Sequence, residues 1–302
     1  MEHLFIINPA AGKYNRTDEF SWMIRQICGK HRLRYRIAVS QRPGDCTRLA
    51  REAAETGQEL RIYACGGDGT LNEIVCGVVG FPNVAVTHYI GGTGNDFVRV
   101  FSETEPFRDL ERLLDCEETQ FDLIDCNGDY GLNVCSVGFD ARVGTQVAAY
   151  KRIPLVHGLG AYALSAAVNV IKGISEHYVL EIQGEVIDAP QTLIYAGNGC
   201  CYGGGFRPVP DADPGDGKLE VLVVAKASRL QVASLIGKYK NGQYAQLPDK
   251  IRHFRTDRLT IHCDRETGIN LDGELRLGRD IHIRISPHKL RFFYPKGLTY
   301  RK

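Results

Sequence analysis

Short apolar runs alternate with segments of helical spacing over the first 125 residues of the chain. The runs have the length of buried strands, and between them apolar positions recur every three or four residues, as on one face of a helix. Because strands that alternate with helices form parallel βαβ units, this half predicts a doubly wound parallel sheet. We expect strands at residues 4–7, 34–39, 60–65 and 84–90, and helices at residues 18–30, 47–56 and 71–79.

From about residue 122 the pattern changes to alternating apolar and polar positions. Segments such as LEVLVVA, RLTIHC, DIHIRI and KLRFFY are separated by Gly, Asp and Pro turns. That pattern is typical of antiparallel sheets, so we expect a sandwich-like β domain, with helices near residues 160–174 and 230–240. The sequence therefore predicts an α/β domain at 1–125 and a β-rich domain at 126–290.

Composition restricts the possible functions. The 302 residues carry a formal net charge of +1, so there is no excess of cations and we expect no nucleic-acid binding. The ten cysteines include no CxxC pair, which indicates reduced thiols rather than disulfides or a zinc site.

The most apolar long window, residues 155–174, is interrupted by His157, three glycines and Asn169. A membrane span needs about twenty predominantly apolar residues, so we expect no transmembrane span. Residues 1–7 are too few for the apolar core of a signal peptide. We therefore expect a cytoplasmic protein that at most associates peripherally with the inner membrane surface.

Three glycine-rich turns follow strands of the first domain: NPAAGK at 8–13, GGDGT at 66–70 and GGTGND at 91–96. Glycine lets a backbone approach phosphate oxygens closely, and a following helix supplies N–H groups and the positive end of its dipole. Each turn alone is most often a plain strand-ending turn. Three turns at one edge of a sheet favour a phosphate site, although none matches Walker A or the GxGxxG fingerprint.

Acidic residues stand in two of these turns, Asp68 and Asp96. A carboxylate repels polyphosphate unless a divalent ion lies between them, and Mg²⁺ favours that combination of carboxylate, water and phosphate. The turns therefore predict a nucleoside triphosphate with Mg²⁺ as the ligand.

Motifs spread over nearly the whole chain carry a family resemblance. They are NPAAGK, GGDGTLNEIV and GGTGNDFVR in the first domain, then FDLIDCNGDYGLNVCSVGFDARV, GNGCCYGGGFRPVPDADPGDGKLEVLVV and NLDGE. In this order they resemble the diacylglycerol kinase catalytic-domain family, specifically the bacterial soluble lipid kinases. GGDG turns also occur in NAD kinases and phosphofructokinases, which leaves a kinase of a soluble acceptor as the alternative.

The resemblance implies that the 66–72 loop holds the phosphates of ATP and that neighbouring turns contact the nucleotide. Ser40 stands where the family usually has Thr, and it keeps the hydroxyl. The residues expected to contact ATP are Asn8, Gly12, Ser40, Gly66, Gly67, Asp68, Gly69, Thr70, Asn72, Thr93 and Gly94.

The resemblance also implies two magnesium sites. At the catalytic site, Asp68, Asp96 and Asp122 would hold Mg²⁺ directly or through water. The second is a structural site in the β-rich domain, although the DADPGDGK segment taken alone favours a solvated acidic turn. Its expected ligands are the carboxylate of Asp216 and the main-chain carbonyls of Asp213 and Lys218.

Glu274 in the LDGE motif resembles the catalytic residue of the family, with Asp272 beside it. Phosphoryl transfer needs positioning and charge neutralisation more than covalent help, and a carboxylate can accept the proton of the attacking hydroxyl. Asp-Gly between two apolar stretches is also a strong hairpin signal, and both interpretations can hold.

Residues for the lipid are less clear. Tyr162, Leu164 and Val168 on the expected 160–174 helix are candidates for an acyl-chain site, although an ordinary core face is the more common explanation for each of them. The basic, aromatic segment HKLRFFY is expected to form a strand and to help at an anionic membrane surface. As in family members, residues 291–302 are expected to complete the first domain.

The sequence thus predicts an ATP- and Mg²⁺-dependent kinase of a lipid hydroxyl, such as that of diacylglycerol, with its active site in the cleft between the domains. The lipid would be presented at a membrane surface. The alternatives are a kinase of a soluble acceptor such as NAD and a non-catalytic nucleotide- or lipid-binding regulator, and the intact acids Asp68, Asp272 and Glu274 argue against the regulator. The identity of the lipid and the formation of a homodimer stay open.

Overall fold

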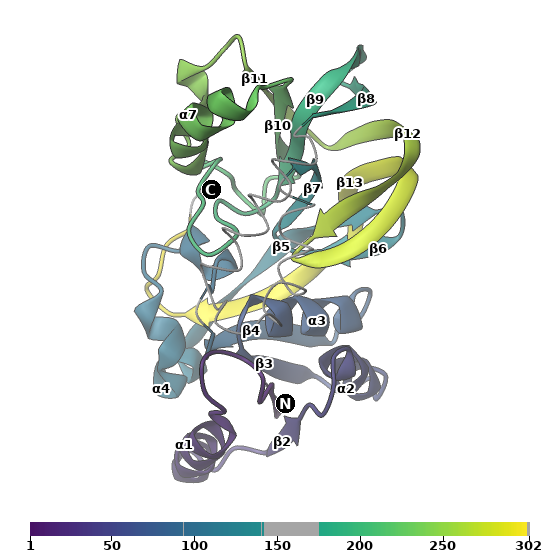
Figure 1. Ribbon diagram of the computed structural model, residues 1–302. Helices are drawn as coiled ribbons and strands as arrows, with labels where there is room; N and C mark the ends of the chain where they lie inside the picture. The colour runs from purple at the N-terminus through teal and green to yellow at the C-terminus, as the bar shows by residue number, and fades with distance from the viewer. Residues whose placement is uncertain (93, 140, 142–174, 301–302) are drawn as a thin grey trace. The chain divides into compact units, whose positions relative to one another are not determined.

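The computed structural model describes residues 1–92, 94–139, 141 and 175–300 (Figure 1). The chain forms two compact units. Unit 1 contains Met1–Leu123, Asp213–Asp216 and Ser286–Lys302, and unit 2 contains Ile124–Ala212 and Gly217–Ile285. The expected helix at 160–174, with Tyr162, Leu164 and Val168, lies outside the described residues, and so does Thr93.

Unit 1 is built on a parallel sheet. Its strands follow the order β2 (Tyr35–Val39), β1 (Glu2–Ile7), β3 (Leu60–Gly66), β4 (Val84–Ile90) and the end of β13 (Glu274–Pro295). β3 and β4 are mostly apolar and are buried along almost their whole length, as parallel strands with both faces covered are. The end of β13 joins the sheet where Arg291 lies opposite Ala85.

Helices α1 (Thr17–Lys30), α2 (Asp45–Ala54) and α3 (Asp68–Val78) connect these strands. The chain passes from β1 to β2 on one side and then crosses back to β3 on the other. Because such crossovers are right-handed, α1 covers one face of the sheet, and α2 and α3 cover the opposite face. Close packing of α2 on α3 depends on Gly77, whose Cβ would lie 2.5 Å from the carbonyl oxygen of Thr47.

The direction of the crossovers reverses between β1 and β3. In open α/β sheets, ligands bind at such a switch point, outside the carboxyl ends of the strands. In unit 1 a ligand site is therefore expected at the turns that follow β1 and β3.

Aromatic packing holds the end of β13 in unit 1. The ring centroid of Phe292 lies 5.4 Å from that of Phe121 and 5.7 Å from that of Phe97. All three rings are buried, so they add both apolar area and edge-to-face contacts to this core. The elements that bring these rings together are η1 (Phe97–Val100), η2 (Glu105–Arg108), α4 (Leu110–Leu114) and β5 (Cys116–Cys126).

Unit 2 is an antiparallel β structure. Its strands follow the order β11 (Ile251–Thr256), β10 (Leu219–Ala225), β9 (Glu185–Gly197), β7 (Val134–Gly138), β12 (Arg258–Leu271) and the start of β13. Further pairings add β8 (Glu176–Ile182) to β9 and β12, and β6 (Asp129–Gly131) to the end of β5. Alternate side chains, such as those of Leu180, Ile194 and Ile261, share one buried core. The connecting segments include α7 (Arg229–Lys240) and η3 (Tyr244–Gln246).

Several elements differ from their expected boundaries, and two of the differences bear on the site and the units. α3 begins at Asp68 rather than at residue 71, because Gly67 takes the N-cap position with extended backbone angles. β13 runs unbroken through Pro287, where the sequence predicts the two strands DIHIRI and KLRFFY. The chain passes from unit 2 to unit 1 beside that proline, so the interruption in the pattern marks a change of unit rather than the end of a strand.

Candidate functional site

The turns that follow β1 and β3 are joined directly. The backbone N–H of Asn8 donates to the carbonyl oxygen of Cys65 at 3.1 Å. The side-chain amide of Asn8 donates to the hydroxyl of Thr70 at 3.0 Å. The NPAAGK turn is therefore tied to the first turn of α3 at the switch point of the sheet.

The turn after β4 stacks on the turn after β3 through backbone contacts. The carbonyl oxygen of Gly66 accepts hydrogen bonds from the N–H groups of Gly91 at 2.7 Å and Gly92 at 2.9 Å. A Cβ on Gly92 would lie 2.5 Å from the Cα of Gly67, and one on Gly12 would lie 2.8 Å from the carbonyl oxygen of Gly91. Rotation of a side chain cannot relieve contacts with backbone, so these glycines allow all three turns to converge.

The first turn of α3 faces open space at Gly69. A Cβ at this exposed residue would meet nothing within 4 Å. The carbonyl oxygen of Gly67 accepts the N–H groups of Thr70 at 3.0 Å and Leu71 at 3.1 Å, which starts the helix. The amino end of a helix presents N–H groups and a positive dipole end to anions. This arrangement fits a phosphate group at the amino end of α3.

Asp68 and Asp96 lie beside this end of the helix. Oδ1 of Asp68 accepts the backbone N–H of Asp96 at 2.6 Å. Oδ2 of Asp68 lies 2.5 Å from the position that a Cβ on Gly94 would take, and Oδ2 of Asp96 lies 3.7 Å from it. Burial raises the pKa of Asp68, although hydrogen bonds from the backbone of residues 95–97 act in the opposite direction. Glycine at position 94 thus leaves room for two neighbouring carboxylates.

These two carboxylates fit Mg²⁺, which usually binds one or two carboxylates together with waters and substrate phosphates. Asp122, the third acid expected at this site, has a partner of its own. It is 1% exposed, and its Oδ1 forms an ion pair with Nζ of Lys289 at 2.7 Å. Among the described residues, no three of His, Cys, Asp or Glu are grouped as ligands for a metal ion. Lys289 thus balances the buried charge of Asp122, and a place for Asp122 beside the catalytic Mg²⁺ stays a prediction.

Three further residues of the expected ATP site are buried: Ser40, Thr70 and Asn72. Ser40 follows β2, and its backbone N–H donates to the carbonyl oxygen of Ile7 at 2.9 Å. Ser40 thus stands at the same edge of the sheet as the glycine turns, and its contact with the nucleotide stays a prediction. Of these side chains, that of Thr70 binds the NPAAGK turn through Asn8.

The expected structural magnesium loop is divided between the units. Asp213–Asp216 belongs to unit 1, where the carbonyl oxygen of Pro214 accepts the backbone N–H of Asp122 at 2.6 Å, whereas Lys218 belongs to unit 2. Asp213 accepts backbone N–H groups from residues that follow it in the turn. The loop thus has the form of an acidic turn, and the magnesium site with Asp216 stays a prediction.

In unit 2 the LDGE motif forms a tight hairpin between β12 and β13. Asp272 and Gly273 have φ angles of 50° and 92°, as the two central residues of a type I′ turn require. Leu271 and Glu274 pair across the turn. The side-chain oxygen of Asn270 accepts the N–H of Gly273 at 2.8 Å, which closes the turn from within.

The carboxylate of Asp272 binds three consecutive backbone amides. It accepts hydrogen bonds from Leu132 at 2.6 Å, Val134 at 2.7 Å and Asn133 at 3.1 Å. The backbone N–H of Asp272 donates in return to the carbonyl oxygen of Val134 at 3.0 Å. Hydrogen bonds to an ionised acceptor are among the strong ones in proteins. The geometry therefore gives Asp272 a positioning role: it fixes the hairpin that carries Glu274.

Segments from three motifs of the resemblance meet around this hairpin. The side-chain amide of Asn133 donates to the carbonyl oxygen of Cys201 at 2.7 Å. The carbonyl oxygen of Asn133 accepts the N–H groups of Asn198 at 2.9 Å and Gly199 at 3.1 Å. Asn198 in turn donates its side-chain amide to the carbonyl oxygen of Leu132 at 2.7 Å. The LNVCS, GNGCC and LDGE segments therefore form one connected site, at whose edge Glu274 is exposed to solvent.

Some residues at these sites were not among those predicted from the sequence. Arg99 has a local signal, because it follows Asp96 by three residues in a short helix and its Nε lies 3.5 Å from Oδ1 of that acid. Lys289 and Asn133 have none, since their partners come from distant segments. His88 was expected only as part of a buried strand, yet its Nε2 lies 3.0 Å from the carbonyl oxygen of Gly66.

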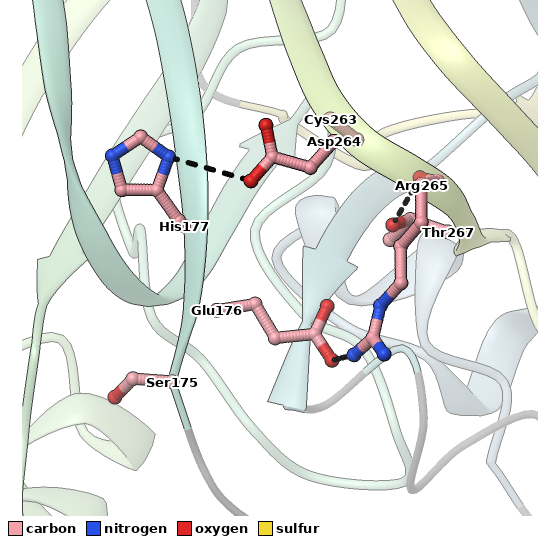
Figure 2. Close-up of a pocket in the computed structure, with 7 residues that line it drawn as sticks. All are labelled: Ser175, Glu176, His177, Cys263, Asp264, Arg265 and Thr267. Carbon is pink, nitrogen blue, oxygen red and sulfur yellow. Dashed lines mark hydrogen bonds and ion pairs between the residues drawn. The ribbon is translucent and has the colours of Figure 1, made fainter.

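A separate pocket of about 390 Å³ lies on unit 2 beside β8 and β12 (Figure 2). Within it Arg265 pairs with Glu176 at 2.9 Å, and Nδ1 of His177 lies 3.9 Å from a carboxylate oxygen of Asp264. Burial raises the pKa of the Cys263 thiol, which makes it a poor nucleophile. None of the expected site residues lines this pocket. Its lining consists of Ser175, Glu176, His177, Cys263, Asp264, Arg265 and Thr267.

The basic, aromatic C-terminal segment makes contacts within unit 1. Lys289 pairs with Asp122, Arg291 pairs with Glu118 at 2.6 Å, and Phe292 is fully buried. A role of this segment at an anionic membrane surface stays a prediction. In the part of the chain that the structure describes, no helix combines the length and the apolar character of a membrane span.

The fold and the glycine turns are those of a nucleotide-dependent kinase class. Residues 2–126 match the diacylglycerol kinase catalytic domain, and residues 133–294 match the YegS C-terminal NAD kinase beta sandwich-like domain. The chain belongs to this family of lipid kinases, as its motifs indicate, and use of ATP follows from that membership.

Similar proteins support the same assignment. The protein described as "Probable lipid kinase YegS-like" from Chromohalobacter salexigens is 30% identical over 299 residues, which cover 97% of this chain and 93% of that protein. A crystal structure described as a diacylglycerol kinase from Bacillus anthracis strain Sterne has the same fold, with a TM-score of 0.70 at 18% identity over 98% of this chain and 97% of that one. The expected α/β domain followed by a sandwich-like β domain is thus confirmed.

Proposed function

We propose that this protein is an ATP- and Mg²⁺-dependent lipid kinase that transfers the γ-phosphoryl group of ATP to a lipid hydroxyl such as that of diacylglycerol. The observation that carries the proposal is the convergence of three glycine turns at the open amino end of α3, in a chain of the lipid kinase family. Backbone N–H groups and a helix dipole at such a point are suited to the phosphates of a nucleotide.

The residues beside this helix end suit the charge of a triphosphate. Asp68 and Asp96 would hold Mg²⁺, which when bound neutralises charge on the phosphoryl oxygens. Arg99 adds a positive charge beside Asp96 and donates a hydrogen bond to the carbonyl oxygen of Gly94 at 3.2 Å, so it also fixes the turn. Gly69 leaves the approach to the helix end free.

On the acceptor side, Glu274 is the proposed general base. Its carboxylate takes the proton of the lipid hydroxyl while the hydroxyl oxygen forms a bond to the γ-phosphorus. The bond between that phosphorus and the β–γ bridging oxygen breaks, and ADP leaves. Asp272 keeps the hairpin in place through its three amide hydrogen bonds.

We propose a lipid acceptor because the similar protein of Chromohalobacter salexigens is described as a lipid kinase. Such a substrate would be reached at a membrane surface by a peripherally bound protein. The alternative acceptor is a soluble one such as NAD, since the second domain is described as NAD kinase beta sandwich-like.

An acceptor screen tests the proposal. Purified protein is incubated with ATP labelled in the γ-phosphate and with vesicles that contain diacylglycerol, with vesicles that lack it, or with NAD, each with Mg²⁺ and with excess chelator. We expect label in the lipid phase only with diacylglycerol or a related hydroxyl lipid, and only with Mg²⁺. Label in NAD, or none in any lipid of a headgroup panel, would contradict the lipid acceptor.

A further inference from the structure

His88 occupies an unusual position in β4. The side chain is 0% exposed, in a strand whose other residues are also buried. Its Nε2 lies 3.0 Å from the carbonyl oxygen of Gly66, the last residue of β3. A carbonyl oxygen can only accept, so Nε2 carries the proton and Nδ1 is bare. Burial lowers the pKa of His88 to about 4, which keeps the ring neutral near pH 7.

The carbonyl oxygen of Gly66 connects the two stacked turns. It accepts the N–H groups of Gly91 at 2.7 Å and Gly92 at 2.9 Å in addition to the bond from His88. Gly66 has no side chain that could fix its peptide, and the side chain of Thr70 fills the place of a Cβ. The orientation of this peptide therefore depends on what its carbonyl oxygen binds.

Histidine is energetically unfavourable at this buried position. Its Nδ1 is buried without a hydrogen-bond partner among the described residues. A buried polar atom that lacks a partner destabilises a fold, whereas leucine at the same place would bury only apolar atoms. What histidine adds over leucine is the Nε2–H that reaches Gly66.

We propose that His88 is a positioning residue for nucleotide binding, which holds the Gly66 peptide and thereby the two glycine turns in the arrangement that receives phosphate. This inference rests on the proposed function. Gly66 directly precedes Gly67, the N-cap of α3, so a change in the Gly66 peptide is passed to the amino end of that helix. His88 touches no substrate and acts through the backbone.

The chain contains a matched control in His3. This side chain is 5% exposed on β1 of the same sheet, and burial lowers its pKa to about 4 as well. Its Nδ1 forms a hydrogen bond of 2.9 Å with the hydroxyl of Tyr63, which belongs to β3 and not to a turn. Replacement of His3 thus removes a buried neutral histidine of the same sheet without changing the hydrogen bonds of Gly66.

The test compares four variants of the full-length protein by calorimetric titration with MgATP. His88→Gln keeps an amide N–H at the distance of Nε2, whereas His88→Asn is too short to reach Gly66 and His88→Leu has no donor. We expect His88→Gln to bind MgATP within about threefold of the parent, and His88→Asn and His88→Leu to bind it about tenfold more weakly. His3→Leu should bind it like the parent, even if its melting temperature falls.

The outcomes separate the inference from the proposed function. If the parent protein does not bind MgATP, the proposed function fails and the role of His88 fails with it. If the parent binds MgATP and the Asn and Leu variants bind it equally well, His88 is only a core residue and the inference alone is overturned. Should His88→Leu not fold, the contrast between Gln and Asn decides. In steady-state assays, the same contrast should appear in KM for ATP more than in kcat.

Discussion

Two Asp-Gly pairs, Asp68-Gly69 in unit 1 and Asp272-Gly273 in unit 2, use the same dipeptide in different ways. Both carboxylates accept backbone N–H groups from a neighbouring segment. In unit 1 the pair opens a helix and Gly69 faces open space. In unit 2 both residues have positive φ and form a hairpin turn whose carboxylate is bound to three amides. The element that contains the dipeptide thus decides whether its glycine faces open space or closes a hairpin.

The largest expected effect comes from Glu274, the exposed acid that the second pair supports. Glu274→Gln keeps size and hydrogen bonding but cannot accept a proton. We expect kcat to fall by about 10²–10⁴-fold with MgATP affinity nearly unchanged. Initial rates at saturating ATP and lipid measure this. Glu266→Gln, on the exposed surface of β12, is the matched control and should keep parental rates. A parental rate in Glu274→Gln would move the base elsewhere.

Gly69 tests whether the first pair faces a ligand. Gly69→Val puts a branched side chain into open space, so the fold should keep its melting temperature while ATP affinity falls at least about tenfold. Gly29→Val in α1 also points into open space, far along the chain from the turns, and is expected to leave both quantities unchanged. Equal ATP affinity in the two variants would mean that phosphate does not approach α3 at Gly69.

Substitution of the two acids should affect stability differently. Asp272→Asn offers one acceptor oxygen to three amides, so we expect the free energy of unfolding to fall by about 1–3 kcal/mol. Asp68→Asn removes a carboxylate whose charged form burial disfavours, as its raised pKa indicates, so it should lose less stability. Urea denaturation of both variants measures the difference. A greater loss for Asp68→Asn would reverse the roles given to the two acids.

Low pH should reduce the stability of unit 1 because buried histidines resist protonation in the folded state. Burial lowers the pKa of His3 to about 4 from an ordinary value of 6.5, so the unfolded chain binds more protons between these pH values. This contribution to stability is present above pH 6.5 and is lost as the pH falls towards 4, by about 1 kcal/mol at pH 5.5. His3→Leu should therefore show a smaller loss of stability between pH 7 and 5.5 than the parent in urea titrations. An equal loss would exclude His3 as a source of acid sensitivity.

An exposed histidine of unit 2 gives the smallest expected effect, with opposite sign. Hydrogen bonding to Asp280 raises the pKa of His262. Its contribution is present below the ordinary pKa and is lost as the pH rises through the raised one. Because the pair is exposed, His262→Gln should change stability by no more than about 1 kcal/mol, and only at acid pH. A loss of stability confined to alkaline pH would contradict this sign.

Local patterns were sufficient for most of the fold. The expected strand at 84–90 coincides with β4, and the family resemblance is confirmed by matches over both domains. The glycine turns were found because their residues stand next to each other after strands, and topology alone brings such turns to one edge. In the same way, the Asp-Gly signal of the LDGE motif gave the hairpin correctly.

Long-range partners could not be found in this way. Asp122 forms an ion pair with Lys289, which comes from the far end of the chain, and no local pattern predicts that pair. The three amides that bind Asp272 lie some 140 positions earlier, and no periodicity of the sequence predicts that contact. The role of His88 could not be predicted for another reason. The apolar pattern around it indicates only a buried strand, and the direction of its Nε2 depends on packing that the sequence does not show.

The course of β13 has a consequence for synthesis of the protein. Its first residues belong to unit 2, and its last residues supply the neighbour of β4 in unit 1. While the chain grows on the ribosome, β4 therefore keeps an unpaired edge until the residues around Arg291 have been made, although N-terminal domains usually fold first. An open edge invites pairing with other chains. A fragment that ends near residue 125 would carry that edge permanently, so expression of the first domain alone should yield aggregates unless the last strand is joined to it.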